Sequence, residues 1–325
     1  MFRLLIKLFP LLAVVGTYFF LQKYEINGLG GIGVAERKET PTAVGPVVPV
    51  RPGDKLRIAS WNIQVFGESK AGDAKSIEVI AQTIRQFDVV AVQEIRASSP
   101  DFLDRFMRLV NSGGLQYGYV VGPRLGRSDS KEQYAFIFDQ SRVEIDRSPS
   151  GTYTVRDPDD LLHREPLVAG FRARNAPPNE AFTFSLVNIH TDPDEVDAEL
   201  NALDDVFRAV RNDGRGEDDV ILLGDLNTDE GHLGQLGQVP YIDCAIRGTP
   251  TNTRRDKTYD NILFDRNATT EYLGVPGVLD LVRQFNLTQD QALKVSDHLP
   301  IWAEFSVYEG GRPGSVAGLP PAAAR

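Results

Sequence analysis

Apolar segments of strand length outnumber helix-like segments between residues 55 and 307, and this excess constrains the fold more than any other feature of the sequence. Several of these segments follow one another with no helix pattern between them. Such an order predicts an α/β fold with two packed mixed sheets and helices outside, and it argues against a purely parallel doubly wound sheet. The predicted strands are Leu56–Ile63, Val89–Val92, Tyr134–Phe138, Leu167–Ala173, Phe182–Ile189, Val220–Leu223, Asn261–Phe264 and Ile301–Val307.

Helical spacing of apolar residues occurs between the first two strands and again later in the chain. Ile77, Ile80 and Ile84 repeat on one face, and a longer stripe runs from Val196 to Val210. A stripe of this kind covers a sheet and leaves its opposite side to solvent. We therefore predict a helix against each sheet.

The amino end carries a pattern typical of export. Residues 1–24 contain an apolar run from Leu4 to Leu21, with Arg3 and Lys7 near its start. No small-residue cleavage site follows, so we expect an uncleaved signal-anchor; a cleaved signal peptide and a buried helix are the alternatives. Either export reading predicts an extracytoplasmic domain, attached to a membrane by the N-terminal helix or secreted after cleavage.

The remaining boundaries follow from composition. Residues 25–54 are rich in Gly and Pro without periodicity, which predicts a linker. Residues 308–325 have a similar composition and predict a disordered tail. Residues 55–307 are long enough for one large domain, and we expect a monomer.

Charge and cysteine content exclude some classes of protein. The net charge of −10 argues against a tight, static binder of a polyanion, because such affinity comes largely from Lys and Arg. An enzyme that releases its product needs only local cations at the phosphate. Cys244 is the only cysteine, so an intrachain disulfide and a thiolate metal site are both excluded.

Polar residues stand where the predicted strands begin or end. Each alone is commonly a turn or cap residue. Together they combine carboxylates, amides and two of the four histidines, and hard oxygen donors of this kind suit Mg²⁺ or Mn²⁺, with Ca²⁺ as a further candidate. These residues are Asn62, Glu94, His190, Asp225, Asn227, Asp260, Asp297 and His298.

Five short motifs in this order resemble the endonuclease/exonuclease/phosphatase superfamily: Trp61-Asn62-Ile63, Gln93-Glu94, Gly224-Asp225-Leu226-Asn227, Tyr259-Asp260 and Ser296-Asp297-His298. The resemblance covers essentially all of residues 55–307. Longer matches, such as Asn62 to Glu68 and Arg164-Glu165-Pro166, are similar to its deoxyribonuclease I branch. The resemblance implies a four-layer α/β sandwich, in which two packed mixed β-sheets are flanked by helices.

The resemblance also implies a site that holds metal and phosphate. Glu94, with Asn62 and Asp297 nearby, would bind a divalent metal, Mg²⁺ or Mn²⁺ and as a further candidate Ca²⁺. Asp225 and Asn227 would bind the phosphate or a second metal. A cation at carboxylates supplies the positive charge that phosphodiester hydrolysis requires.

His190 and His298 are implied as the acid–base pair, because an imidazole held by a carboxylate can take or give a proton near neutral pH. Asp260 would orient one histidine, and Glu132 would support His190. Three arginines would contact the backbone or groove of a nucleic acid: Arg96, Arg127 and Arg164.

These observations favour a metal-dependent phosphodiesterase, and within that class an endonuclease acting on DNA. A phospholipid or sphingolipid phosphodiesterase is the main alternative, since a membrane tether would place the site beside such a substrate. A non-catalytic binding module on the same scaffold is the third. A module of that kind would usually have lost a histidine or a metal carboxylate, and all are present here.

Overall fold

The computed structural model describes residues 24–27, 33–36, 51–127, 131–148 and 150–313. The chain divides into two units, Met1–Val47 and Val48–Arg325. In the first, β1 (Tyr24–Asn27) pairs antiparallel with β2 (Gly33–Glu36). The linker predicted for residues 25–54 therefore contains most of a short hairpin. The sequence did not predict it, because strands of four residues are too short to show a side-chain period.

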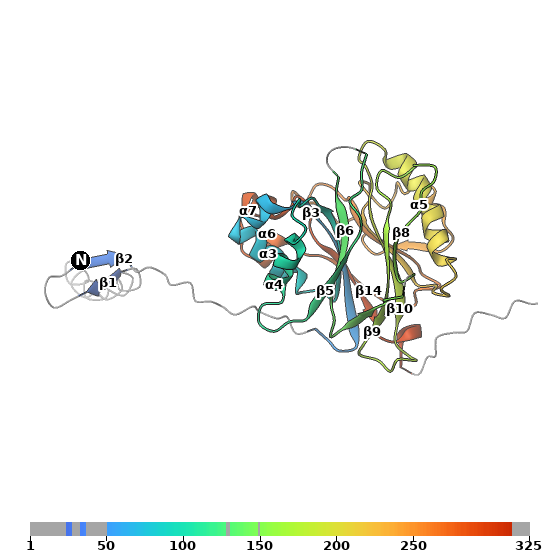
Figure 1. The fold of residues 1–325 in the computed structure, drawn as a ribbon, viewed down its shortest axis with the longest axis horizontal. Coiled ribbons are helices and arrows are strands. Elements are labelled where there is room, and N and C mark those ends of the chain that lie inside the picture. Colours follow the sequence, from blue (N-terminus) through green and yellow to red (C-terminus); the bar gives the residue numbers. More distant parts are fainter. Residues whose placement is uncertain (1–23, 28–32, 37–50, 128–130, 149, 314–325) are drawn as a thin grey trace, which may run out of the picture. The chain divides into compact units, whose positions relative to one another are not determined.

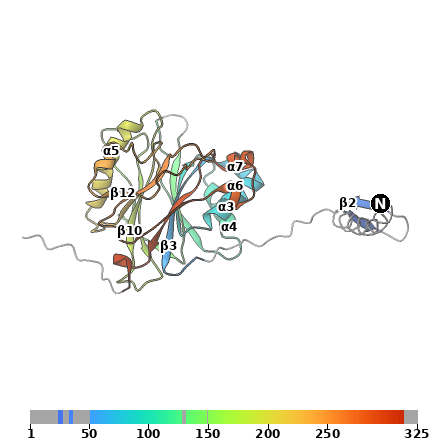
Figure 2. The same ribbon diagram turned by 180° about the vertical axis from the view of Figure 1, so that it is seen from behind.

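The second unit contains two mixed sheets that lie face to face (Figures 1 and 2). The six-stranded sheet has the order β14 (Tyr272–Val278), β15 (Ile301–Ser306), β3 (Lys55–Phe66), β4 (Val89–Ile95), β6 (Gln133–Asp139), β5 (Tyr117–Val121). The seven-stranded sheet has the order β12 (Ile242–Cys244), β13 (Asp260–Asp265), β11 (Val220–Asp225), β10 (Thr183–His190), β9 (Leu167–Ala173), β7 (Val143–Ile145), and β8 (Thr152–Thr154) pairs with β9.

Helices cover the outer faces of the sandwich (Figure 1). Those beside the six-stranded sheet are α2 (Glu68–Ala71), α3 (Ala74–Ile84), α4 (Phe102–Val110), α6 (Leu281–Gln284) and α7 (Gln289–Val295). The long helix α5 (Val196–Arg211) covers the seven-stranded sheet, next to the short 3-10 helix η1 (Leu236–Gln238). The helices predicted around Ile77–Ile84 and Val196–Val210 are present as α3 and α5.

Three apolar cores separate these layers. The central core lies between the sheets and contains aromatic rings in contact, such as Phe171 with Phe136 and Phe184. A second core packs α3, α4 and α7 on the six-stranded sheet, and a third packs α5 on the other sheet. The four-layer α/β sandwich predicted from the sequence is therefore confirmed.

The folded unit extends beyond both predicted boundaries. Arg51 forms an ion pair with Asp88 at 2.8 Å and another with Asp139. At the other end, η2 (Glu309–Gly311) packs onto the fold, and the carboxylate of Glu309 accepts a hydrogen bond from Thr183 N–H. Arg51 and Glu309, just outside residues 55–307, thus belong to the folded domain through polar contacts. The predicted boundaries were too narrow because the periodicity of apolar residues does not reveal such contacts.

The predicted membrane anchor falls on residues 1–23, outside the described residues, and stays a prediction. Among the helices that the structure does describe, none is long and apolar enough to cross a membrane.

Candidate active site

The catalytic candidates meet at one end of the sandwich because of the strand directions. β10 and β11 run parallel, and His190 and Asp225 are register partners at their carboxyl ends. β13 runs antiparallel to β11, so its first residue, Asp260, is the partner of Asp225. In the other sheet, β3 and β4 are parallel and carry Asn62 and Glu94 at the corresponding end. Side chains far apart in sequence are thus brought together by rigid strands.

His190 is buried and held by a carboxylate. Its Nδ1 lies 2.8 Å from Oε1 of Glu132, which is also buried. Arg164 lies behind the pair: its Nε donates to the His190 carbonyl at 3.2 Å and lies 3.5 Å from Glu132 Oε1. Burial alone would lower the pKa of His190, but the Glu132 and Asp225 carboxylates outweigh it and raise that pKa.

His298 has the same kind of support from the opposite side. Its Nδ1 lies 3.0 Å from Oδ2 of Asp260, and Thr251 Oγ1 donates to the same oxygen at 2.7 Å. Burial again opposes the charged imidazole, but Asp260 and Asp225 raise the pKa of His298 well above its ordinary value. The resemblance predicts that Glu132 supports His190 and that Asp260 orients one of the histidines. Both contacts are present, and the histidine beside Asp260 is His298.

The two imidazoles face a common point. Oδ2 of Asp225 lies 3.6 Å from His190 Nε2 and 3.5 Å from His298 Nε2. Because each Nδ1 is engaged by its own carboxylate, each Nε2 is the nitrogen left to exchange a proton with a substrate. Two such nitrogens around one oxygen fit a reaction that removes one proton and delivers another.

The predicted metal residues lie beside this point. Glu94 Oε1 accepts from Asn62 Nδ2 at 3.2 Å, and Asp297 Oδ2 accepts from Gln64 Nε2 at 2.9 Å. The Asp297 side chain is 45% exposed, so a solvated cation can approach it. The carboxylates of Glu94, Asp225 and Asp297 are hard donors, and the donor set fits Mg²⁺ or Mn²⁺.

Asn62 has contacts that suit positioning more than ligation. Its Nδ2 donates to both Glu94 and Asp225, the latter at 3.0 Å, and its Oδ1 accepts from Gln64 N–H. The amide oxygen is therefore already engaged. Asn62 links the two sheets' carboxylates, and its role as a direct metal ligand stays a prediction.

Asp225, Asp260 and His298 also lie close enough to suggest a metal site, with one ligand atom of each within 4.8 Å of the others. The hydrogen bonds argue against it. Asp260 is occupied by His298 Nδ1 and by Thr251, so its oxygens orient the imidazole. Asp260 therefore serves His298, and a divalent metal at Glu94 and Asp297 stays a prediction.

The backbone is strained where the site is built. Glu94 and Asn227 have φ values of 59° and 51°, and Val65 has 52° although it is β-branched. Val65 N–H donates to Glu94 Oε2 at 2.9 Å, and Asn227 N–H donates to Asp225 Oδ1 at 3.0 Å. Left-handed residues cost energy that a fold keeps where it serves a site. Here the two N–H groups fix the positions of the Glu94 and Asp225 carboxylates.

The predicted arginines separate into different environments. Arg96 lies in the site, 3.1 Å from Glu94 and 3.4 Å from Glu132, and its side chain is 27% exposed. The Arg164 side chain is only 7% exposed, and its contacts make it a positioning residue behind His190. Arg127 forms an ion pair with Glu195 at 2.6 Å on a separate loop. Of the three, Arg96 is best placed to contact a substrate directly.

Lys70 was missed by the sequence analysis. Its Nζ donates to the carbonyls of Ile63 at 3.0 Å and Val295 at 2.6 Å, and so ties the end of β3 to the end of α7. Burial lowers the pKa of Lys70 to about 8, although the Asp297 and Glu94 carboxylates act in the opposite direction. No local pattern marks this lysine, because both of its partners are backbone atoms.

The fold and the site together define a phosphoester hydrolase: two carboxylate-held histidines face one oxygen, and hard oxygen donors lie beside them. Residues 59–298 match the model of the Endonuclease/Exonuclease/phosphatase family. The chain belongs to this family, and it is a hydrolase of the nuclease and phosphodiesterase class.

Named relatives agree with that assignment. The chain is 30% identical to human deoxyribonuclease-1-like 1, covering 82% of this chain and 90% of the relative. It is also 30% identical to human deoxyribonuclease gamma, covering 76% and 84%. Among solved structures, the human Nocturnin catalytic domain superimposes with a TM-score of 0.53 at 17% identity, covering 78% of this chain and 94% of that one. This last likeness concerns the fold.

Replacing Lys70 with methionine is expected to raise the Mg²⁺ concentration needed for half-maximal diester hydrolysis about 10-fold, the lower end of the range for residues that support metal ligands. The loss of both hydrogen bonds frees Ile63, which is next to Asn62, and Val295, which stands two residues before Asp297. Lys75→Met, at an exposed position of α3, is the matched control. An unchanged Mg²⁺ dependence in Lys70→Met would contradict the role.

Proposed function

We propose that this chain is an endonuclease that hydrolyses DNA phosphodiester bonds with His190 and His298 as its acid–base pair. The observation that carries the proposal is the convergence of both Nε2 atoms on Asp225 Oδ2, at 3.6 and 3.5 Å. A phosphoryl group bound beside Asp225 would have one imidazole on the side of the attacking water and the other on the side of the leaving oxygen.

The chain's own residues supply the proton transfers. One imidazole removes a proton from water as it attacks phosphorus, and the other protonates the oxygen that leaves. Glu132 and Asp260 keep each ring in the tautomer that presents Nε2, and both stabilise the imidazolium form. A divalent cation bound by Glu94 and Asp297 would offset the carboxylate charge and stabilise negative charge on the phosphoryl oxygens.

DNA is favoured as the substrate by the relatives and by Arg96. Both human relatives are named as deoxyribonucleases. Arg96 adds a partly exposed cation at the edge of the site. Its guanidinium can be inserted into a narrow minor groove of the DNA, where the negative potential is strong.

Incubation of the purified protein with supercoiled plasmid and Mg²⁺ tests the proposal, and conversion to the nicked form is the expected result. Parallel reactions contain single-stranded DNA, RNA and sphingomyelin vesicles. Cleavage of sphingomyelin far faster than of any nucleic acid would replace the DNA proposal by the lipid phosphodiesterase, and binding of DNA without any cleavage would favour a binding module.

Arg96→Ala is expected to lower kcat/KM for duplex DNA cleavage roughly 5- to 150-fold. This corresponds to a loss of about 1–3 kcal/mol of transition-state binding. Hydrolysis of a small aryl phosphodiester should change little, because such a substrate has no groove. Arg105→Ala, exposed on α4 and paired with Asp101, is the control. Equal loss on both substrates would show instead that Arg96 acts on the reacting centre through Glu94 or Glu132.

A further inference from the structure

A second group of carboxylates lies at the other end of the sandwich. Asp219 directly precedes β11, whereas the catalytic Asp225 ends that strand, roughly 20 Å away at about 3.3 Å per residue. Glu271 directly precedes β14, and Glu309 begins η2. One oxygen from each of Asp219, Glu271 and Glu309 lies within 4.8 Å of the others. Three segments distant in sequence therefore meet at this point.

Unpartnered oxygens face this group from buried side chains. Asp219 is 1% exposed and Glu271 is fully buried, yet Asp219 Oδ1 and Glu271 Oε2 have no hydrogen-bond partner among the described residues. The hydroxyl of Thr269, also buried, lies beside the Asp219 carboxylate, and Asp219 lies beside Glu271. Buried polar atoms are nearly always satisfied, so these oxygens must either share protons with one another or bind a further ligand.

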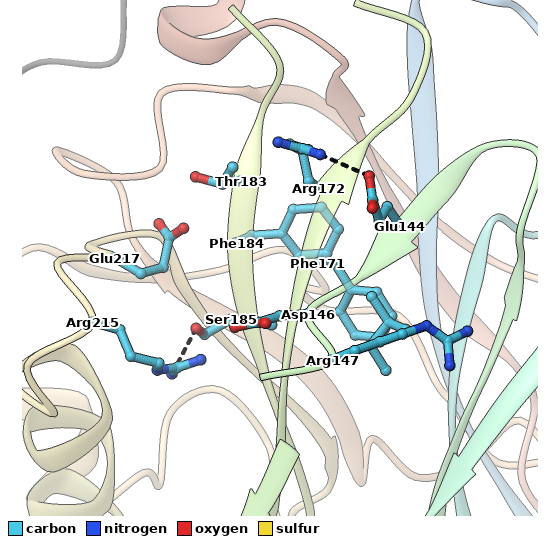
Figure 3. Close-up of a pocket in the computed structure, with 12 residues that line it drawn as sticks. Glu144, Asp146, Arg147, Phe171, Arg172, Thr183, Phe184, Ser185, Arg215 and Glu217 are labelled. Carbon is cyan, nitrogen blue, oxygen red and sulfur yellow. Dashed lines mark hydrogen bonds and ion pairs between the residues drawn. The ribbon is translucent and has the colours of Figure 1, made fainter. Parts of the chain in front are cut away.

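No side-chain cation compensates these carboxylates. Within the part of the chain that the structure describes, no Lys or Arg forms an ion pair with Asp219, Glu271 or Glu309. Arg215 lies near Glu217 at the edge of a neighbouring pocket of about 410 Å³ (Figure 3), but it donates to Asp213 and to Ser185. The flanking Glu217 and Asp218 add further negative charge.

Uncompensated carboxylates in such a place must either hold protons or bind a cation. Burial, with the neighbouring Glu271 and Glu217, raises the pKa of Asp219 well above its ordinary value. Burial and Glu271 raise the pKa of Glu309 to about 7.

We propose that Asp219, Glu271, Glu309 and the Thr269 hydroxyl form a structural Ca²⁺ site, separate from the catalytic metal. Ca²⁺ accepts a buried set of several protein oxygens in flexible geometry, whereas Mg²⁺ usually keeps several waters. The ion would join the start of β11, the start of β14 and the turn η2. Through β11, this site and the catalytic site lie on opposite ends of one strand.

Thermal unfolding with and without Ca²⁺ tests the site. The protein is the full chain carrying Glu94→Gln, a substitution chosen to remove the catalytic metal. Ca²⁺ at about a hundredfold excess over its Kd is expected to raise Tm by roughly 5–10 °C. Glu309→Gln, at the half-buried member of the group, should abolish this shift. Equilibrium dialysis with ⁴⁵Ca²⁺ should show one ion per chain in Glu94→Gln and none when both substitutions are combined.

Proton sharing without metal gives a different result. An acid whose folded pKa is raised holds its proton in the native state, so stability falls as pH rises from about 4.5 to about 7 for Glu309. If this fall is the same with and without Ca²⁺, and no ion is bound after Glu94→Gln, the proposal is wrong. Ca²⁺ that abolishes the fall supports it. Neither outcome depends on nuclease activity.

Discussion

Replacing His298 with alanine is expected to lower kcat for plasmid nicking by about 10²-fold or more, the usual loss when a positioned acid or base is removed. Asp260 Oδ2 orients the imidazole from 3.0 Å at Nδ1, and Nε2 lies 3.5 Å from Asp225 Oδ2. The alanine side chain has no group that could transfer a proton from the position of Nε2. His190→Ala, which removes the partner imidazole, is expected to have an effect of the same size.

The chain offers a matched control in His232, whose side chain is 76% exposed and pairs with Asp229 on the surface. His232→Ala should leave kcat unchanged. Circular dichroism and Tm separate catalysis from folding, because both active-site histidines are buried. A His298→Ala protein with native circular dichroism and near wild-type turnover would remove that histidine from the mechanism.

The places of His190 and His298 at strand ends could be predicted from sequence because the two residues follow or precede strong strand patterns. His190 ends an apolar run and His298 precedes another, and such runs predict buried strands. Parallel pairing of β10 with β11 then fixes which side chains meet. The pairing partner itself is not written in a local pattern, so Glu132 and Asp260 could be assigned only through the family resemblance.

Four of the strands missed by the sequence analysis lack that pattern. β14 (Tyr272–Val278) contains two glycines and a proline, and its central residues are exposed, so it shows neither alternation nor a continuous apolar run. β7, β8 and β12 have only three residues each, and one period of alternation does not stand out from a loop. Their existence depends on the neighbouring strand that they extend.

Tertiary contacts explain the remaining differences at the site. Arg164 was predicted to meet the substrate, but its guanidinium is buried beside Glu132, and burial depends on elements that pack from elsewhere in the chain. Lys70 bonds only backbone carbonyls, from Ile63 and Val295, which lie on different elements. The acidic group at Asp219 likewise combines segments that no spacing rule connects.

Removal of divalent metal is expected to lower the rate of DNA hydrolysis by about 10³-fold or more, since a cation at the reacting phosphate supplies several kcal/mol. Glu94, Asp225 and Asp297 gather negative charge where the proposed phosphodiester substrate would bind. Arg96 is a partly exposed cation at this site, and it is already paired with Glu94 and Glu132. Without metal, the carboxylates therefore repel the phosphodiester anion, and the negative charge on the reacting phosphoryl group is no longer stabilised by a cation.

Chelator followed by excess Mg²⁺ provides the reversible form of this test, and activity should return with the metal. Glu94→Gln should be nearly inactive at any Mg²⁺ concentration, because it removes a proposed ligand charge that is less exposed than that of Asp297. Glu309→Gln, which changes only the distant acidic group, should keep Mg²⁺-dependent nicking while the fold is intact. Full nicking in excess chelator would show that the two histidines work without a cation, and the carboxylate Glu94 would then serve only to hold Val65 and Arg96 in place.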